Sequence, residues 1–284
     1  MRAALVSLRP RQWTKNLLLF AGLIFAAKLG DAIRWVEAVT AFVAFCAASS
    51  AAYVVNDLRD APHDRLHPTK NSRPLARGEL TRGVALALAG GLAVLSVALT
   101  AALGLSTLLH LAAFLGLQAA YTLALKEVVL LDVMAIGALF VVRAAAGADA
   151  VRVPISPWLL LCTALLALFL GLAKRRGELV LVGAEATPGR PVLVGYSLEL
   201  VDQLVSVVAA STVIAYSLYT FSARDSKAMM VTIPFVLFGV FRYLLLVHRH
   251  DLGEEPENVL LKDLPILVCV AGWATTAALI LTLT

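Results

Sequence analysis

The chain has 284 residues, of which 60% are hydrophobic and 15% are charged, and its mean hydropathy is +0.86. These values exclude an ordinary soluble domain and are typical of a protein that lies mostly within a lipid bilayer. The formal net charge is +5. Because the basic residues gather beside apolar segments and not on a soluble surface, they predict phosphorylated or anionic-lipid partners and no nucleic acid.

Apolar segments almost free of charge recur along the whole chain. A transmembrane helix needs about 20 apolar residues, so the chain has room for about nine spans with short connections. The sequence therefore predicts an all-α polytopic membrane protein that forms one integral-membrane domain, residues 1–284. In chain order, the predicted spans are about residues 17–27, 35–55, 84–103, 107–125, 129–148, 157–173, 203–222, 230–247 and 264–283.

The first predicted span is short, and it crosses the bilayer only if its helix begins near Gln12 and Trp13. Lys15 and Lys28 would then extend to opposite interfaces. A signal peptide is the alternative, with cleavage near residues 26–27. Its leading region would be unusually long, so the sequence favours the span.

The loops predict the orientation. With nine spans, most of the 24 lysine and arginine residues fall on one side of the membrane, and cytoplasmic loops carry such an excess. We therefore expect a multi-pass protein of the inner (plasma) membrane, with its amino terminus in the cytoplasm.

A stretch rich in acidic residues, NDLRDAPHD, directly follows the second predicted span. Pro62 disfavours helical geometry at the preceding residue, so the last acid of the stretch is expected after a kink. Carboxylates this close repel one another unless a cation lies between them, and hard oxygen ligands select Mg²⁺, with Mn²⁺ as second choice. The alternative is a solvated loop whose acids balance its own basic residues. On an ideal helix, four polar side chains would share an arc of about 100° and face one cavity: Asn56, Asp57, Asp60 and Asp64.

A basic segment stiffened by two prolines comes next. Lys70, Arg73 and Arg77 are suitable donors for the oxygens of a diphosphate or a sugar phosphate. Each of them alone has an alternative role as an anchor at the membrane surface.

These motifs resemble a known family. NDxxDxxxD followed by KxxRP, at the end of the second of nine spans, is similar to the first aspartate-rich motif of the UbiA prenyltransferase superfamily. The likeness extends to RPRQWTKN, AKRRGEL, FRYL and EPENVLLKD, so it covers nearly the whole chain. Together these motifs resemble the branch of the family that transfers phosphoribose to a polyprenyl phosphate. The resemblance implies a UbiA-type helix bundle with an active-site cavity that faces the cytoplasm.

One feature departs from most of the superfamily, whose members usually carry a second DxxxD motif after the sixth helix. Here that loop begins with Lys174, Arg175 and Arg176. A basic loop suits a second phosphate group better than a second metal ion. Membrane-surface anchoring is the alternative.

Polar residues near or inside later spans are further candidates. Tyr121 and Lys126 flank the loop after the fourth span, and Asp132 begins the fifth. Lys126 and Asp132 are expected to complete the donor pocket, with anchoring at the membrane interface as the alternative. Arg143 is expected to pair with Asp149, whereas Arg242, about a turn and a half from the cytoplasmic end of the eighth span, is expected to face the cavity as a phosphate ligand.

The resemblance implies a reaction between 5-phosphoribosyl 1-diphosphate and a polyprenyl phosphate, with decaprenyl as the expected chain, for cell-wall arabinan precursors. Pyrophosphate leaves, Mg²⁺ is required, and the ionised acceptor needs no general base. Two alternatives stay open: a UbiA-type transferase that moves a polyprenyl group from its diphosphate to an aromatic acceptor, and an anion or lipid transporter. Whether the protein forms homo-oligomers also stays open. The resulting assignment makes Asp57, Asp60 and Asp64 the catalytic and metal-binding residues, and the substrate-binding residues are Asn56, Lys15, Lys70, Arg73, Arg77, Tyr121, Lys126, Lys174, Arg175 and Arg242.

Overall fold

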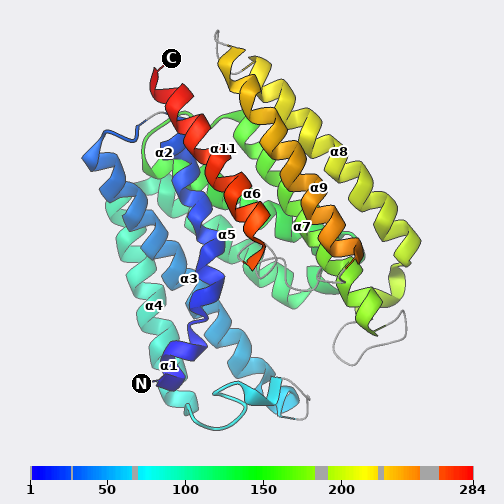
Figure 1. The fold of residues 1–284 in the computed structure, drawn as a ribbon. Coiled ribbons are helices and arrows are strands. Elements are labelled where there is room, and N and C mark those ends of the chain that lie inside the picture. Colours follow the sequence, from blue (N-terminus) through cyan, green and yellow to red (C-terminus); the bar gives the residue numbers. More distant parts are fainter. Residues whose placement is uncertain are drawn as a thin grey trace. The chain divides into compact units, whose positions relative to one another are not determined.

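The structure is a computed structural model that describes residues 2–26, 28–65, 70–182, 191–222, 227–249 and 262–283. In these ranges the chain is helical and has no strand, which confirms the all-α prediction (Figure 1). The chain forms two compact units: Met1–Thr122 with Val142–Ile155, and Leu123–Val141 with Ser156–Thr284. We call them unit 1 and unit 2 and describe each by itself. That residues 1–284 form one domain stays a prediction.

Within the described ranges, eight helices are long and apolar enough to cross a membrane, so the chain is a multi-pass membrane protein. The short helices are α1 (Arg2–Ser7), η2 (Lys70–Ser72), η3 (Leu125–Glu127) and η4 (Pro191–Gly195). The long ones are α3 (Ala32–Asp64), α4 (Arg82–Leu103), α5 (Leu105–Leu123), α6 (Leu131–Ala150), α7 (Pro157–Val182), α8 (Leu198–Ser222), α9 (Ile233–Arg249) with η5 (Lys227–Thr232) before it, and α11 (Leu264–Leu283).

The first predicted span consists of two short helices in series, the 3₁₀ helix η1 (Pro10–Phe20) and the α-helix α2 (Ala21–Phe25). A 3₁₀ helix rises about 2.0 Å per residue and an α-helix about 1.5 Å, so the two together are about 30 Å long. That length equals the thickness of the hydrocarbon core. The eight long helices and this segment together agree with the prediction of about nine spans.

Two glycines allow this segment to lie directly against the second part of α6 within unit 1. A Cβ atom added to Gly147 would lie 2.2 Å from the carbonyl oxygen of Leu19, and one added to Gly22 would lie 2.6 Å from the Cα atom of Ala148. Close approach of two backbones through small residues is a common way to pack helices in membranes. The contact explains why an irregular segment keeps a fixed position.

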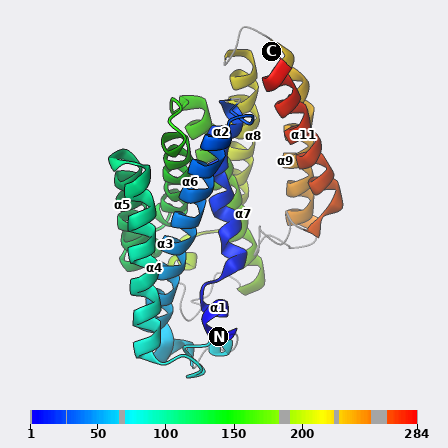
Figure 2. The ribbon, with the colours of Figure 1, turned by 90° about the vertical axis from the view of Figure 1, so that its left-hand side faces the viewer.

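In unit 1, α3 and α4 run side by side (Figure 1, Figure 2). The loop between them folds back against both helices, because Leu75 and Leu80 are buried with Val54 of α3 and Ala85 of α4. The apolar side chains of this loop therefore hold its basic residues near the end of α3.

Unit 2 packs α7 against α8, and α9 against both α8 and α11 (Figure 1). Its core includes Phe169, Val205 and Tyr243. The hydroxyl of Tyr216 on α8 accepts a hydrogen bond from Nε1 of Trp273 on α11, at 2.7 Å, and also contacts the hydroxyl of Thr232, at 2.6 Å. These polar contacts fix the position of α11 on α8 and η5.

We expect Gly147→Ala to lower the thermal stability of the purified protein, because the new methyl group would overlap the backbone at Leu19. Gly116→Ala is the matched control, since a Cβ atom there meets nothing within 4 Å. Melting temperatures in detergent measure the difference. A Gly147→Ala variant as stable as the control would show that the backbone contact is not required.

Candidate active site

The acidic residues of the NDLRDAPHD stretch all lie on one helix. α3 continues through Pro62 as far as Asp64, and the N–H of Arg65 still donates to the carbonyl of Ala61, at 3.3 Å. Asp64 is therefore the last residue of α3, and the helix also carries Asp57 and Asp60 near the same end.

The four predicted ligands divide into two pairs. Nδ2 of Asn56 donates to Oδ2 of Asp60, at 2.9 Å. Asp57 and Asp64 are seven residues apart, almost two helical turns, and so lie one above the other on the same face. Nη1 of Arg73 donates to both, at 3.1 Å to Oδ1 of Asp57 and 2.7 Å to Oδ2 of Asp64. The structure thus places Arg73 against these acids, whereas the sequence assigned it to donor phosphates and expected a metal ion between the acids.

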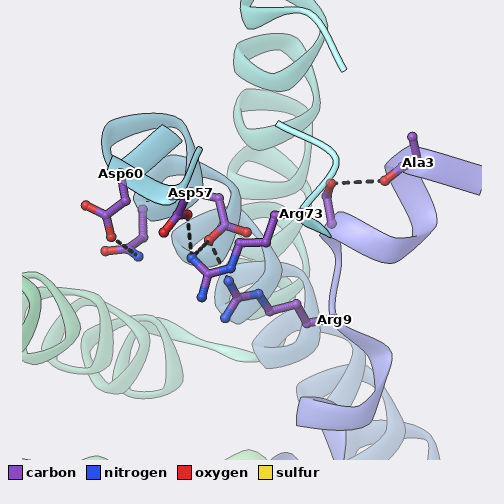
Figure 3. A network of polar contacts seen from close by, with 8 residues as sticks. Ala3, Arg9, Asp57, Asp60 and Arg73 are labelled. Carbon is purple, nitrogen blue, oxygen red and sulfur yellow. Dashed lines mark hydrogen bonds and ion pairs between the residues drawn. The ribbon is translucent and has the colours of Figure 1, made fainter. Parts of the chain in front are cut away.

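Arg9 supplies a second guanidinium to the same place, and the sequence assignment did not include it. Its Nη2 lies 2.5 Å from Oδ1 of Asp57, and its guanidinium lies over the ring of Tyr53, 4.9 Å from the centroid. Figure 3 shows Arg9 and Arg73 converging on Asp57, with Asp60 turned away from them. The signal available in the sequence was the basic RPRQWTKN motif, which is predicted to lie on the same side of the membrane as the acids.

Burial explains why these ion pairs form. The side chains of Asp57 and Asp64 are only 5% and 6% exposed, whereas those of Arg9 and Arg73 are 28% and 26% exposed. A buried carboxylate is costly unless a positive charge or several hydrogen-bond donors lie beside it. Two guanidinium groups therefore balance two carboxylates at this end of α3, and both remain accessible to a ligand.

The oxygen donors of this cluster fit a hard divalent cation. Among the described residues, no group of three or more His, Cys, Asp or Glu side chains is close enough to hold a metal ion. However, Asp57 and Asp64 already hold one positively charged atom, Nη1 of Arg73, between their oxygens. Mg²⁺ is typically held by one or two carboxylates, with water and phosphate oxygens completing its shell. The pair fits such an ion if a phosphorylated substrate completes the site.

The other predicted ligands of unit 1 differ in burial. Arg77 is exposed and pairs with Glu79, at 3.1 Å. Lys15 on η1 and Tyr121 on α5 are half-buried. The side chain of Lys70 lies outside the described part of the structure, so its predicted role stays a prediction.

A second buried charge cluster lies in unit 2, around Arg175. This side chain is 2% exposed, and its guanidinium donates to Asp132, at 2.6 Å, and to Glu178. The hydroxyl of Tyr196 donates to the other oxygen of Asp132, at 2.6 Å, and accepts from the N–H of Leu130, at 2.8 Å. Burial and the hydrogen bond to Asp132 raise the pKa of the Tyr196 phenol, so it stays protonated as a donor.

Arg176 and Arg242 each have a carboxylate partner in unit 2. Arg176 donates to Asp202, at 2.7 Å, and to the carbonyl of Val247, at 3.1 Å. Arg242 donates twice to Asp263, at 2.9 and 3.3 Å, and these bonds lower the pKa of that carboxyl group. A phosphate that binds Arg242 would exchange with this carboxylate.

Lys126 and Lys174, which were also predicted to bind substrate, are half-buried on η3 and α7.

Arg143 lies buried in unit 1, and its described contacts differ from the expected pair with Asp149. Nε of Arg143 donates to Oδ1 of Asn16, at 2.8 Å, and the guanidinium lies 4.5 Å from the centroid of Phe114. Asp149 instead accepts a hydrogen bond from Thr107, at 2.8 Å. Arg143 thus bonds to a residue of η1, and Asp149 bonds to a residue of α5. The spacing of the two residues along α6 could not predict these partners.

We expect Tyr196→Phe to destabilise the protein by about 1–3 kcal/mol, because Asp132 and the N–H of Leu130 would each lose a buried hydrogen-bond partner. Tyr121→Phe, which removes a hydroxyl from unit 1, serves as the comparison. Thermal unfolding in detergent measures both. Equal melting temperatures for the two variants would mean that the Tyr196 hydroxyl does not stabilise the Asp132–Arg175 pair.

Comparison with known proteins identifies the family of the chain. Residues 17–262 match the family described as the UbiA prenyltransferase family. The chain is 34% identical to a decaprenyl-phosphate phosphoribosyltransferase of Mycolicibacterium smegmatis, over 95% of this chain and 89% of the relative. It is 32% identical to the protein of that name from Corynebacterium glutamicum, over 94% of this chain and 83% of the relative.

Solved structures show the same fold. A UbiA homolog from Archaeoglobus fulgidus bound to GPP and Mg²⁺ superposes with a TM-score of 0.75 at 20% identity, covering 99% of this chain and 100% of that one. A digeranylgeranylglyceryl phosphate synthase gives a TM-score of 0.70 at 16% identity, covering 100% of this chain and 99% of that one. At these identities the likeness shows the fold alone. On the family match and the full-length relatives, the chain belongs to the UbiA prenyltransferase family.

Proposed function

We propose that this protein transfers a 5-phosphoribosyl group from phosphoribosyl diphosphate to a polyprenyl phosphate, with decaprenyl phosphate as the acceptor, and releases pyrophosphate. The observation that carries the proposal is the buried pair Asp57 and Asp64, which share one accessible cation. The names and the full-length similarity of the relatives support the choice of substrates.

The reaction breaks the bond between the anomeric carbon and the diphosphate oxygen, and forms a bond from that carbon to an oxygen of the lipid phosphate. Charge develops on the leaving diphosphate while the sugar becomes oxocarbenium-like. Asp57 and Asp64 would hold Mg²⁺, which supplies positive charge to the leaving group. Arg73 would donate to diphosphate oxygens once its carboxylates are occupied.

The chain need not supply a base for this reaction. A lipid phosphate is already ionised near neutral pH, so no proton has to be removed from the nucleophile. Asp60 accepts a hydrogen bond from Asn56, and it would act on the ion only through a water molecule of the hydration shell. The protein's main task is then to position two polyanions.

The basic residues of unit 2 are proposed for the remaining phosphate groups. Lys126, Lys174 and Arg242 are accessible enough to serve in this way, because none of them is buried. Arg175 would first have to leave Asp132 or Glu178, since its guanidinium is paired with both and its side chain is only 2% exposed. We therefore propose that Arg175 contributes least to the direct binding of phosphate.

The membrane setting is part of the same proposal. Most basic residues lie on one side if the spans cross in turn, so the end of α3 that carries Asp57 would face the cytoplasm, where phosphoribosyl diphosphate is made. The protein would lie in the plasma membrane and supply a precursor of cell-wall arabinan. Its oligomeric state stays open.

A direct assay tests the function. Purified protein is incubated with radiolabelled phosphoribosyl diphosphate, decaprenyl phosphate and Mg²⁺, and label in the lipid extract is counted. We expect EDTA to abolish transfer and Asp57→Asn to lower it at least about a hundredfold, since the leaving group would lose its metal. Asp60→Ala should also lower transfer.

Asp31→Asn is the matched control, because Asp31 precedes α3 at the helix end far from Asp57, and asparagine can keep its cap contact with the N–H of Ile33. The control should retain wild-type transfer. If folded protein transfers no phosphoribose but consumes a polyprenyl diphosphate in the presence of an aromatic acceptor, the prenyl-transfer alternative replaces our proposal. If it only moves anions or lipids across proteoliposomes, the transporter alternative does.

A further inference from the structure

We propose that Arg9 is a further substrate-positioning residue of the candidate active site. In the metal-free protein it occupies Asp57 as an internal counter-ion, and in the loaded protein it donates to the diphosphate of the donor. This inference rests on the proposed function, because it assumes a metal–diphosphate ligand at Asp57 and Asp64. It adds a residue that neither the sequence assignment nor the comparisons provide.

The segment that carries Arg9 is anchored on both sides of this residue. The hydroxyl of Ser50 on α3 donates to the carbonyl of Leu8, at 2.9 Å, and accepts from Nε1 of Trp13, at 3.0 Å. Arg9 itself has a left-handed backbone, with φ of 52°, between α1 and η1. Such a conformation is uncommon for a residue other than glycine and persists only where surrounding contacts hold it. The guanidinium is therefore delivered by fixed structure and not by a loose arm.

One face of α3 receives this segment and the acids together. Ser50, Tyr53 and Asp57 are spaced by three and four residues, so they lie one above another on the helix. Ser50 holds the backbone beside Arg9, the ring of Tyr53 lies under its guanidinium at 4.9 Å, and Asp57 accepts its hydrogen bond. The cation–π contact and the ion pair thus fix the direction in which Arg9 points.

The charges explain why Arg9 must change partner. Arg9 and Arg73 both contact Oδ1 of Asp57, and two guanidinium groups already balance the two carboxylates of the pair. A divalent cation at these carboxylates adds two positive charges beside them, which is repulsive in a poorly solvated site. A bound diphosphate makes the interaction with Arg9 attractive, because its negatively charged oxygens accept two parallel hydrogen bonds from a guanidinium. Arg9 therefore weakens binding of the metal ion alone and strengthens binding of the metal ion together with the donor.

This arrangement couples the two ligands. Arg9 hinders metal binding when the donor is absent, and it binds the donor when the metal is present. Because linkage is reciprocal, addition of donor should therefore raise the apparent affinity of the site for the metal. Removal of Arg9 should therefore raise the affinity for the metal ion alone and lower the affinity for the metal ion in the presence of donor. A residue that only supports the fold would weaken both.

Binding of Mn²⁺, followed by electron paramagnetic resonance of the free ion, tests the inference in purified full-length protein. Wild type, Arg9→Gln and Arg11→Gln are titrated alone and with phosphoribosyl diphosphate. Arg11 is the matched control, since it is exposed, lies two residues away and loses the same charge. We expect Arg9→Gln to bind Mn²⁺ alone about three- to tenfold more tightly, which corresponds to the removal of one nearby like charge. It should also lose most of the enhancement by donor, whereas Arg11→Gln should behave as wild type.

Weaker binding of Mn²⁺ in both states, or a change no larger than that of Arg11→Gln, would overturn the inference. If Arg9→Gln does not fold, Arg9→Lys keeps the charge but loses the paired hydrogen bonds. That variant should bind Mn²⁺ alone as wild type does and show less enhancement by donor, and unchanged enhancement would contradict the role of Arg9.

A third series with inorganic pyrophosphate and with geranyl diphosphate separates this inference from the proposed function. If these ligands enhance Mn²⁺ binding through Arg9 but phosphoribosyl diphosphate does not, the donor is wrong while the role of Arg9 stands. If phosphoribosyl diphosphate enhances binding equally in wild type and Arg9→Gln, the role of Arg9 fails while the donor stands.

Discussion

Two carboxylates, Asp57 and Asp64, lie almost fully buried at one end of α3, and such groups need positive charge beside them. The rest of unit 1 is arranged to provide that charge. The η1 segment places Arg9 against α3, and the loop before α4 buries Leu75 and Leu80 and so holds Arg73 over the acids. The same demand for a cation makes the pair suitable for magnesium and a diphosphate.

The buried carboxylates of unit 2 also have positive charge beside them, but there the guanidinium group is enclosed. Arg175 is enclosed at 2% exposure, with Asp132 and Glu178 as partners and Tyr196 as support for Asp132. Arg9 and Arg73, in contrast, are more than a quarter exposed. An accessible guanidinium can exchange a carboxylate for a phosphate, whereas an enclosed one keeps its element in place. Exposure therefore separates residues suited to binding from residues suited to architecture.

Much of this could be predicted from the sequence, because apolar segments and acidic spacing are local properties. The long spans and the shared face of Asp57 and Asp64 follow from helical periodicity. What could not be predicted depends on packing between distant segments. Periodicity does not show that Arg9 crosses to Asp57, that Arg175 is enclosed, or that Arg143 contacts Asn16, since the partners are far apart in the chain.

We propose that Asp57 and Asp64 hold one cation, which is a guanidinium in the free protein and a metal ion in the loaded one. A structure determined with Mn²⁺ and a non-hydrolysable methylene analogue of phosphoribosyl diphosphate tests it directly, because anomalous scattering locates the metal. We expect the metal peak in contact with both carboxylates, and Arg9 and Arg73 turned to the diphosphate. A metal bound elsewhere, with both arginines still on Asp57, would contradict the account.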